Sequence, residues 1–244
     1  MCFSAEASFI SSAILTAGGA ATLKQVKQRN ELPLAMIPFF FAFHQFIEGC
    51  LWLTHDYVSP PWLVSLLAHA FPLVAYSLWP TLVPYAVYRV ETGPARKKLL
   101  VICRIIGIGV SIFFLFHILQ GPVTAKFINQ SIHYDFYFSP WVLSQWLYGF
   151  SIIVATLLSS HRIINLFGVG LVISYNVAKQ LYLATYPSVF CFFAAILSLA
   201  IYLQIRYGAR SRQLQHRPSA SAPGTERETV ALSGSRRQET EYRG

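Results

Sequence analysis

Long runs of apolar residues alternate with short polar segments over the first 210 residues of the chain. Each run holds about 20 residues, which is the length that an α-helix needs to cross a hydrocarbon core of about 30 Å. The pattern therefore predicts an all-α fold class, a polytopic membrane helix bundle with seven transmembrane helices. The third run contains three prolines and is expected to be kinked or locally unwound. The predicted spans are residues 4–23, 33–53, 62–88, 99–119, 140–159, 163–184 and 188–207.

Basic residues divide the connecting segments into two sets. The connections after the first, third and fifth runs, and the segment after the seventh, carry most of the lysines and arginines. Because positive residues mark the cytoplasmic side of a membrane protein, we expect the N-terminus outside and the C-terminus inside. The basic residues concerned are Lys24, Lys27, Arg29, Arg89, Arg96, Lys97, Lys98, Arg162, Arg206, Arg210 and Arg212.

Composition supports a membrane location and indicates which kind of partner the basic residues contact. The chain is 55% hydrophobic and 12% charged, whereas a soluble domain carries about 25% charged residues. Topology signals and lipid-headgroup contacts explain the net charge of +9, so the expected partner is the lipid bilayer and not nucleic acid. We expect a multi-pass protein of the plasma membrane or of the bacterial inner membrane.

The chain divides into two parts by composition. Residues 1–210 hold the predicted spans, whereas residues 211–244 are rich in Ser, Arg, Gln, Glu, Pro and Gly. Such a segment cannot bury a core, so we expect a disordered cytoplasmic tail. The long outer connection, residues 120–139, is rich in aromatic residues, and we expect it to lie on the membrane surface or to cover part of the bundle.

One apolar run contains side chains that lipid does not tolerate. The stretch FFFAFHQFIEGCLWL, residues 39–53, carries His44, Gln45 and Glu48. A lone ionisable group in hydrocarbon costs about 3 kcal/mol on insertion scales. Residues four apart share a helix face, so His44, Glu48 and Trp52 form one stripe with Gln45 at its edge. We expect this stripe to face the interior of the bundle.

Three further runs carry polar groups at a similar depth, in the outer half of the bilayer on the predicted orientation. The hypothesis is one shared polar pocket, in which Glu48 is the counter-ion of Lys179. Two alternatives remain open: Glu48 and His44 form a structural pair, and Lys179 extends to the outer headgroups without a partner. The candidate binding residues are His44, Gln45, Glu48, Trp52, His69, Gln145, Tyr175, Asn176 and Lys179.

Short motifs near the N-terminus carry a family resemblance. The chain opens with MCFSAEASF, continues with ELPLA before the second run, and has HQFIEG and LWL inside that run. Over roughly residues 1–55 it resembles a family of small bacterial multi-pass membrane proteins that share the MCFSA-x-ASF start. That family has no established activity, so the resemblance implies an architecture and no chemistry. The motif positions are Cys2, Phe3, Ser4, Glu6, Gln45, Glu48 and Gly49.

Three functions agree with these observations. The first is a transporter, or a protein that binds a small molecule or an ion in the polar pocket. The second is a membrane-embedded hydrolase or transferase that acts on a lipid headgroup, with His44, Glu48 and His69 as metal ligands, since two histidines and one glutamate form a known zinc set. The third is a structural or signalling membrane subunit. The sequence assigns no cofactor and contains no local metal-binding motif.

Overall fold

The computed structural model describes residues 4–128, 131–137, 142–182 and 185–215, and most of them are helical. The chain divides into two compact units, residues 1–209 and residues 210–244. Within the described residues, four helical segments are long and apolar enough to cross a membrane. They are Arg29–Asp56, Pro61–Val90, Pro94–Gln120 and Tyr186–Gly208.

A helical segment occurs at the position of each predicted span. The last helix continues past residue 211, where the tail was predicted to begin, and the tail from residue 216 lies outside the described residues. The helical elements are α1 (Ala5–Gln25), η1 (Arg29–Glu31), α2 (Leu32–Ala35), α3 (Ile37–Asp56), α4 (Pro61–Pro72), η2 (Leu73–Leu78), α5 (Trp79–Val90), α6 (Pro94–Gln120), α7 (Val142–Leu157), α8 (Arg162–Leu181), α9 (Tyr186–Ser198) and α10 (Ala200–Gln215).

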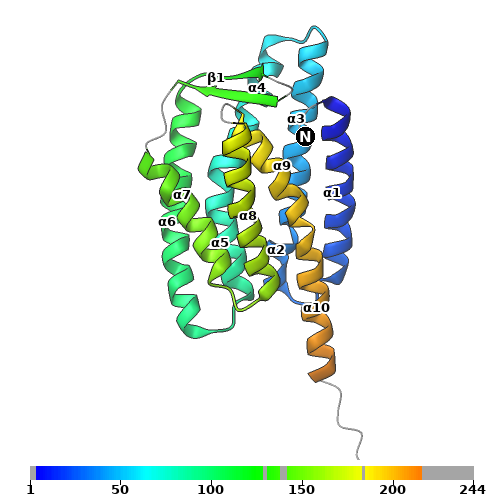
Figure 1. Ribbon diagram of the computed structural model, residues 1–244, viewed down its shortest axis with the longest axis vertical. Helices are drawn as coiled ribbons and strands as arrows, with labels where there is room; N and C mark the ends of the chain where they lie inside the picture. The colour runs from blue at the N-terminus through cyan, green and yellow to red at the C-terminus, as the bar shows by residue number, and fades with distance from the viewer. Residues whose placement is uncertain (1–3, 129–130, 138–141, 183–184, 216–244) are drawn as a thin grey trace, which may run out of the picture. The chain divides into compact units, whose positions relative to one another are not determined.

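The helices of the first unit form a bundle in which α3 has several neighbours. α3 packs on α1, α4 and α9. α5, α6 and α7 pack on one another, and α8 lies between α7 and α9. The connection from α3 to α4 lies at one end of this unit, whereas the α5–α6 and α7–α8 connections lie at the other end (Figure 1).

Glycines allow α1 and α3 to pack closely. A Cβ atom on Gly19 of α1 would lie 2.7 Å from the ring of Phe39. A Cβ atom on Gly49 of α3 would lie 2.9 Å from the ring of Phe9. Both distances are too short for a side chain, so each glycine makes room for an aromatic ring of the partner helix. Small residues at helix contacts are typical of membrane bundles.

The third helical segment changes its winding at prolines, as its composition predicts. Pro72 ends α4, and η2 is a π-helix of 6 residues that leads into α5. Pro80 lies in the first turn of α5. Proline lacks the backbone N–H that would bond to the preceding turn, and single π-helical turns occur inside helices where regular bonding is interrupted. The segment is therefore continuous but locally rewound.

Two strands pair between α6 and α7, so the all-α prediction is wrong for this connection. β1 (Val123–Ile128) pairs antiparallel with β2 (Ser131–Phe136). Ile132 and Tyr134 are buried, and this alternation along β2 is typical of a half-buried strand. The hairpin does cover part of the bundle, because β1 packs on α4 and β2 packs on α9.

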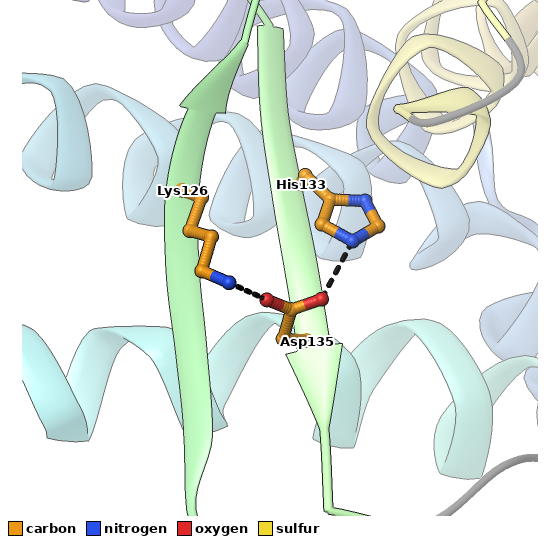
Figure 2. Close-up of polar contacts among 3 residues, drawn as sticks. All are labelled: Lys126, His133 and Asp135. Atoms are coloured by element: carbon orange, nitrogen blue, oxygen red, sulfur yellow. Dashed lines mark hydrogen bonds and ion pairs between the residues drawn. The ribbon is translucent and has the colours of Figure 1, made fainter.

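Charged side chains occupy the outer face of the hairpin. Asp135 pairs with Lys126 of the neighbouring strand and with His133, whose Nε2 atom lies 2.7 Å from the carboxylate (Figure 2). The hydrogen bond from Lys126 holds the pKa of the Asp135 carboxyl below its usual value, with a smaller contribution from His133. Lys126 is exposed and the other two side chains are partly exposed, so solvent screening makes their contribution to stability small.

Glu91 connects two loops at the end of the bundle opposite the hairpin. Its carboxylate accepts hydrogen bonds from the Gly93 N–H at 2.9 Å, the Ser160 N–H at 2.7 Å and the Ser160 hydroxyl at 2.6 Å. Burial alone would raise the pKa of Glu91, but these hydrogen bonds outweigh it and hold the pKa below its usual value. Arg96 also bonds to the Ser160 hydroxyl. The α5–α6 and α7–α8 connections are thereby held together.

Candidate functional site

One face of α3 is polar and completely buried, whereas the opposite face is aromatic and exposed. His44, Gln45 and Glu48 have no exposed surface, and Phe43 and Phe46 are each 50% exposed. A soluble amphipathic helix has the reverse arrangement. α3 therefore turns its apolar side outward, as a helix in contact with lipid does, and the structure buries the polar stripe as the sequence predicts.

Glu48 of α3 is hydrogen-bonded to α9. The Ser188 hydroxyl of α9 donates to Oε1 of Glu48 at 2.6 Å, and both residues are completely buried. Cys191, one turn further along α9, is also buried. The name buried polar cluster denotes His44, Gln45, Glu48 and Ser188.

Ser8 of α1 adds a further polar group to this part of the bundle. Its side chain has no exposed surface, and its hydroxyl has no hydrogen-bond partner among the described residues. The next residue, Phe9, packs against Gly49 of α3, which is one position from Glu48 in the sequence. α1 thus contributes a buried hydroxyl one residue from its contact with α3.

His44 is buried without normal hydrogen bonding. Its imidazole stacks on the Phe71 ring of α4, with ring centres 4.7 Å apart and an angle of 23°. The imidazole approaches the Phe71 backbone, but neither nitrogen makes a hydrogen bond of normal geometry to a described residue. A buried unsatisfied polar group costs about 1–3 kcal/mol, and such groups often serve a functional role or bind a water or ion.

Stacked aromatic rings connect His44 to the hairpin. Phe71 also stacks on Tyr134 of β2, with ring centres 4.4 Å apart and an angle of 3°. A second contact joins Trp52 of α3 to Phe127 of β1, with ring centres 4.8 Å apart. The hairpin therefore covers the end of α3 through aromatic contacts, and one of them reaches the buried polar cluster through a single intervening ring.

A small cavity lies beside Phe41 and Trp79, whose rings contact His44, although none of the four residues of the cluster lines it. Its volume is about 20 Å³, and residues of α3, α5, α7, α8 and α9 line it. Phe41 and Trp79 stack at 4.1 Å and form part of the wall together with Cys191. The lining is mostly apolar, but in the described part of the chain the Trp79 indole N–H has no hydrogen-bond partner. This volume suits about one water molecule, so the site is closed to larger solutes.

Two other predicted site residues contact the hairpin region. Trp52 is 8% exposed and lies under β1, against Phe127. His69 of α4 is half-buried, and its ring nitrogens lie 2.7 Å from the Ser65 carbonyl oxygen and 3.2 Å from the Gly121 carbonyl oxygen. His69 therefore connects α4 to the segment that follows α6. These two hydrogen bonds do not involve the buried polar cluster.

The remaining predicted residues lie on exposed or half-buried faces. Lys179 of α8 is exposed, and its ammonium lies 3.4 Å from the hydroxyl of the half-buried Tyr175. Asn176 is exposed and donates to its own helix backbone at Val172. Gln145 of α7 is exposed too. The structure thus separates these residues from the buried polar cluster. Glu48 is hydrogen-bonded to Ser188, and Lys179 is hydrogen-bonded to Tyr175.

The metal alternative finds no support in this geometry. The described residues contain no group of three or more His, Cys, Asp and Glu side chains placed to hold a metal ion. His44 and Glu48 are neighbours on α3, but both nitrogens of His69 face backbone carbonyl oxygens elsewhere. A hydrolase that uses these three residues as zinc ligands would need a different arrangement of α3 and α4.

Sequence reasoning missed Ser188 of the buried polar cluster, Trp79, whose ring contacts that of His44, and the buried Ser8. Ser8 lies inside the N-terminal motif MCFSAEASF, so its position in a shared motif was one available signal. Ser188 lies two residues after Tyr186, at the start of an apolar run. A single hydroxyl at such a position is not a signal for a functional site. The unpartnered Trp79 N–H had no signal in the sequence, because only packing determines it.

These observations define a class: a mostly helical protein, with helices that are able to cross a membrane and with an acid and an imidazole buried among them. The chain belongs to a family of unknown function, DUF6629, whose model matches residues 1–217. An uncharacterised family is what the N-terminal resemblance implies; residues 1–3 of that motif lie outside the described residues. No curated protein and no solved structure matches the chain.

Proposed function

We propose that the protein is a seven-span membrane transporter that binds a small molecule or an ion at an occluded site next to the buried polar cluster. One observation carries the proposal: Glu48 and His44 are completely buried one turn apart, and His44 lacks normal hydrogen bonds to the described residues. Ionisable residues inside membrane helices typically mark the paths of ions, protons or substrates. A purely structural helix contact needs no imidazole without partners.

The closed cavity fits this proposal as one state of a transport cycle. Transporters place their sites between helices near the middle of the membrane and open them to one side at a time. The rewound segment η2 (Leu73–Leu78) connects α4, which bears Phe71, to α5, which bears Trp79. Movement at this segment would change both the ring that stacks on His44 and the wall of the cavity.

The proposed orientation has the N-terminus outside and the C-terminus inside, in a cell membrane. The α5–α6 and α7–α8 connections share one end of the bundle (Figure 1), and both carry basic residues, including Arg96, Lys97, Lys98 and Arg162. That distribution is typical of a cytoplasmic face.

The orientation predicts opposite accessibility of the two ends. In cells that express a variant whose only cysteine is Cys2, a membrane-impermeant maleimide should label the protein from outside. A variant with its only cysteine at position 230, in the tail, should be labelled only after the membrane is permeabilised. Equal labelling of both variants in intact cells would contradict an odd number of spans.

Transport is tested in proteoliposomes that contain the pH-sensitive dye pyranine. A panel of sodium chloride, amines, amino acids and carboxylates is added outside, and the internal pH is followed. Because Glu48 and His44 can both exchange protons, we expect protons to move with the solute. At least one solute should therefore change the pH in wild-type vesicles, and Glu48→Gln should reduce that rate about tenfold or more. Glu6→Gln, which changes an exposed acid of α1, should retain the rate. Wild-type rates equal to those of protein-free vesicles for the whole panel would contradict the proposal.

One observation favours the structural or signalling subunit as a second candidate. The two cavities described in the bundle measure about 10 Å³ and about 20 Å³, and both are lined mostly by apolar residues. A tightly packed bundle of this kind suits a scaffold. The same vesicle experiment separates the two candidates, because a scaffold gives no solute-dependent pH change in wild-type protein.

A further inference from the structure

Cationic side chains gather on two tyrosine rings where α5 and α6 pack against each other. The Arg104 guanidinium of α6 lies 5.2 Å from the centre of the Tyr85 ring and 4.8 Å from that of Tyr88. Arg89 lies 5.7 Å from the Tyr85 ring centre and donates to its hydroxyl at 2.7 Å. Lys97 lies 5.6 Å from the Tyr88 ring centre. These five residues are called the basic–aromatic site.

Among the described residues, the site holds three positive charges without a neutralising acid. The ion pairs found among those residues both involve Asp135, which lies at the other end of the bundle. Glu91, the acid adjacent to α5, directs its carboxylate to Gly93 and Ser160 instead. Cation–π contacts orient a cation but leave its charge uncompensated. Since Arg89, Lys97 and Arg104 are half-buried, the arrangement favours an anion that bonds to several of them at once.

The surface beyond the cations is apolar. α6 belongs to the segments long and apolar enough to cross a membrane, and Arg104 lies about 15 Å from its first residue at 1.5 Å of rise per residue. One and two turns beyond Arg104, on the same helix face, are Ile108 and Ile112, which are 41% and 61% exposed. Because Arg89 and Lys97 lie at the adjoining ends of α5 and α6, the anionic group would lie between these ends and Arg104, with an exposed hydrocarbon stripe leading away from it.

We propose that the basic–aromatic site binds the phosphate of an anionic membrane phospholipid, whose acyl chain lies along Ile108 and Ile112. Guanidinium groups form paired hydrogen bonds with phosphate oxygens, and basic pockets between membrane helices are typical sites for acidic headgroups. A free phosphate would use the same cations but not the isoleucine stripe. The proposal requires only that α5 and α6 cross a membrane, so it does not depend on transport by the buried polar cluster.

The test measures lipid binding to the full chain in detergent by native mass spectrometry. Dioleoylphosphatidylglycerol should bind at least tenfold more tightly than dioleoylphosphatidylcholine, because the latter headgroup carries its own positive charge. The double variant Arg89→Ala, Arg104→Ala should lose about tenfold of the phosphatidylglycerol affinity. The double variant Lys98→Ala, Arg162→Ala is the matched control, because it removes two exposed cations from the same end of the bundle. It should change the affinity less than twofold.

Two further measurements keep the proposal open to contradiction. Inorganic phosphate at 100-fold excess should not displace the lipid; displacement would identify free phosphate as the ligand and overturn the lipid assignment. If the double alanine variant does not fold, as judged by circular dichroism, Arg104→Gln alone should still lower the affinity at least threefold. Equal wild-type affinity for the two lipids, or an equal loss in the matched control, would overturn the proposal.

Discussion

Replacing Gly107 with alanine is expected to destabilise the protein strongly, although the change adds a single methyl group. A Cβ atom at this position of α6 would lie 1.8 Å from the Pro80 carbonyl oxygen and 2.7 Å from the Pro80 carbonyl carbon. Backbone atoms cannot move aside as a flexible side chain does. Overpacking a core costs about 1–3 kcal/mol and sometimes more, so we expect a loss of about 3 kcal/mol or above.

Gly109, two residues along the same helix, provides the control. A Cβ atom there would meet no heavy atom of the described residues within 4 Å, apart from the backbone of its own helix, and alanine favours a helix over glycine by about 1 kcal/mol. Gly109→Ala should therefore leave the protein unchanged or slightly more stable. Thermal unfolding in detergent measures both variants. A Gly107→Ala variant as stable as Gly109→Ala would show that α5 and α6 do not approach as closely as the structure indicates.

The second large effect is expected at Glu48. Glu48→Ala removes the acceptor of the buried Ser188 hydroxyl and leaves a hole in the bundle. Loss of a buried hydrogen bond and loss of packing together should cost about 3 kcal/mol. Ser188→Ala should cost about 1 kcal/mol. Because the two side chains bond to each other, the double variant should be less destabilised than the sum of the singles, by about 0.5–3 kcal/mol.

Lys179 offers the matched comparison for this cycle. It is exposed on α8 and bonds to Tyr175, so Glu48→Ala combined with Lys179→Ala should show additive effects. The measurement is again thermal stability in detergent, for each single and each double variant. The opposite result would be additive effects for the Glu48 and Ser188 variants and non-additive effects for the Glu48 and Lys179 variants. It would contradict the hydrogen bond seen in the structure and support the ion pair that the sequence suggests.

The positions of the helices and the inward face of α3 followed from the sequence, because apolar length and the spacing of four residues have direct physical meanings. His44 and Glu48 share a face by geometry alone, and lipid cannot solvate them. The same reasoning predicted how deep Lys179 lies along α8, but it did not predict toward which neighbouring helix its side chain points. Depth is set by distance along the chain, whereas direction depends on which neighbouring helix packs where.

The hairpin and the partners of the cluster needed the structure. Ile132 and Tyr134 follow the strand period of two, but the signal is short and lies in a segment rich in polar residues. The Ser188–Glu48 contact joins residues 140 positions apart. A single sequence does not show such a pairing, because a serine at the start of an apolar helix has the same appearance whether it meets an acid or lipid.

The sequence distance between Glu48 and Ser188 has a consequence for how the protein is made. Ribosomes add about 5–20 residues per second, so Ser188 follows Glu48 by roughly 7–28 s, from the separation of 140 residues. During this interval α3 has left the ribosome while the helix that supplies its hydrogen-bond donor is still unsynthesised. α1 is already present and packs on α3, so an early helical pair can shield one side of the acid. In the proposed membrane protein, the other side needs the insertion machinery, or a delayed entry of α3 into lipid, until α9 arrives.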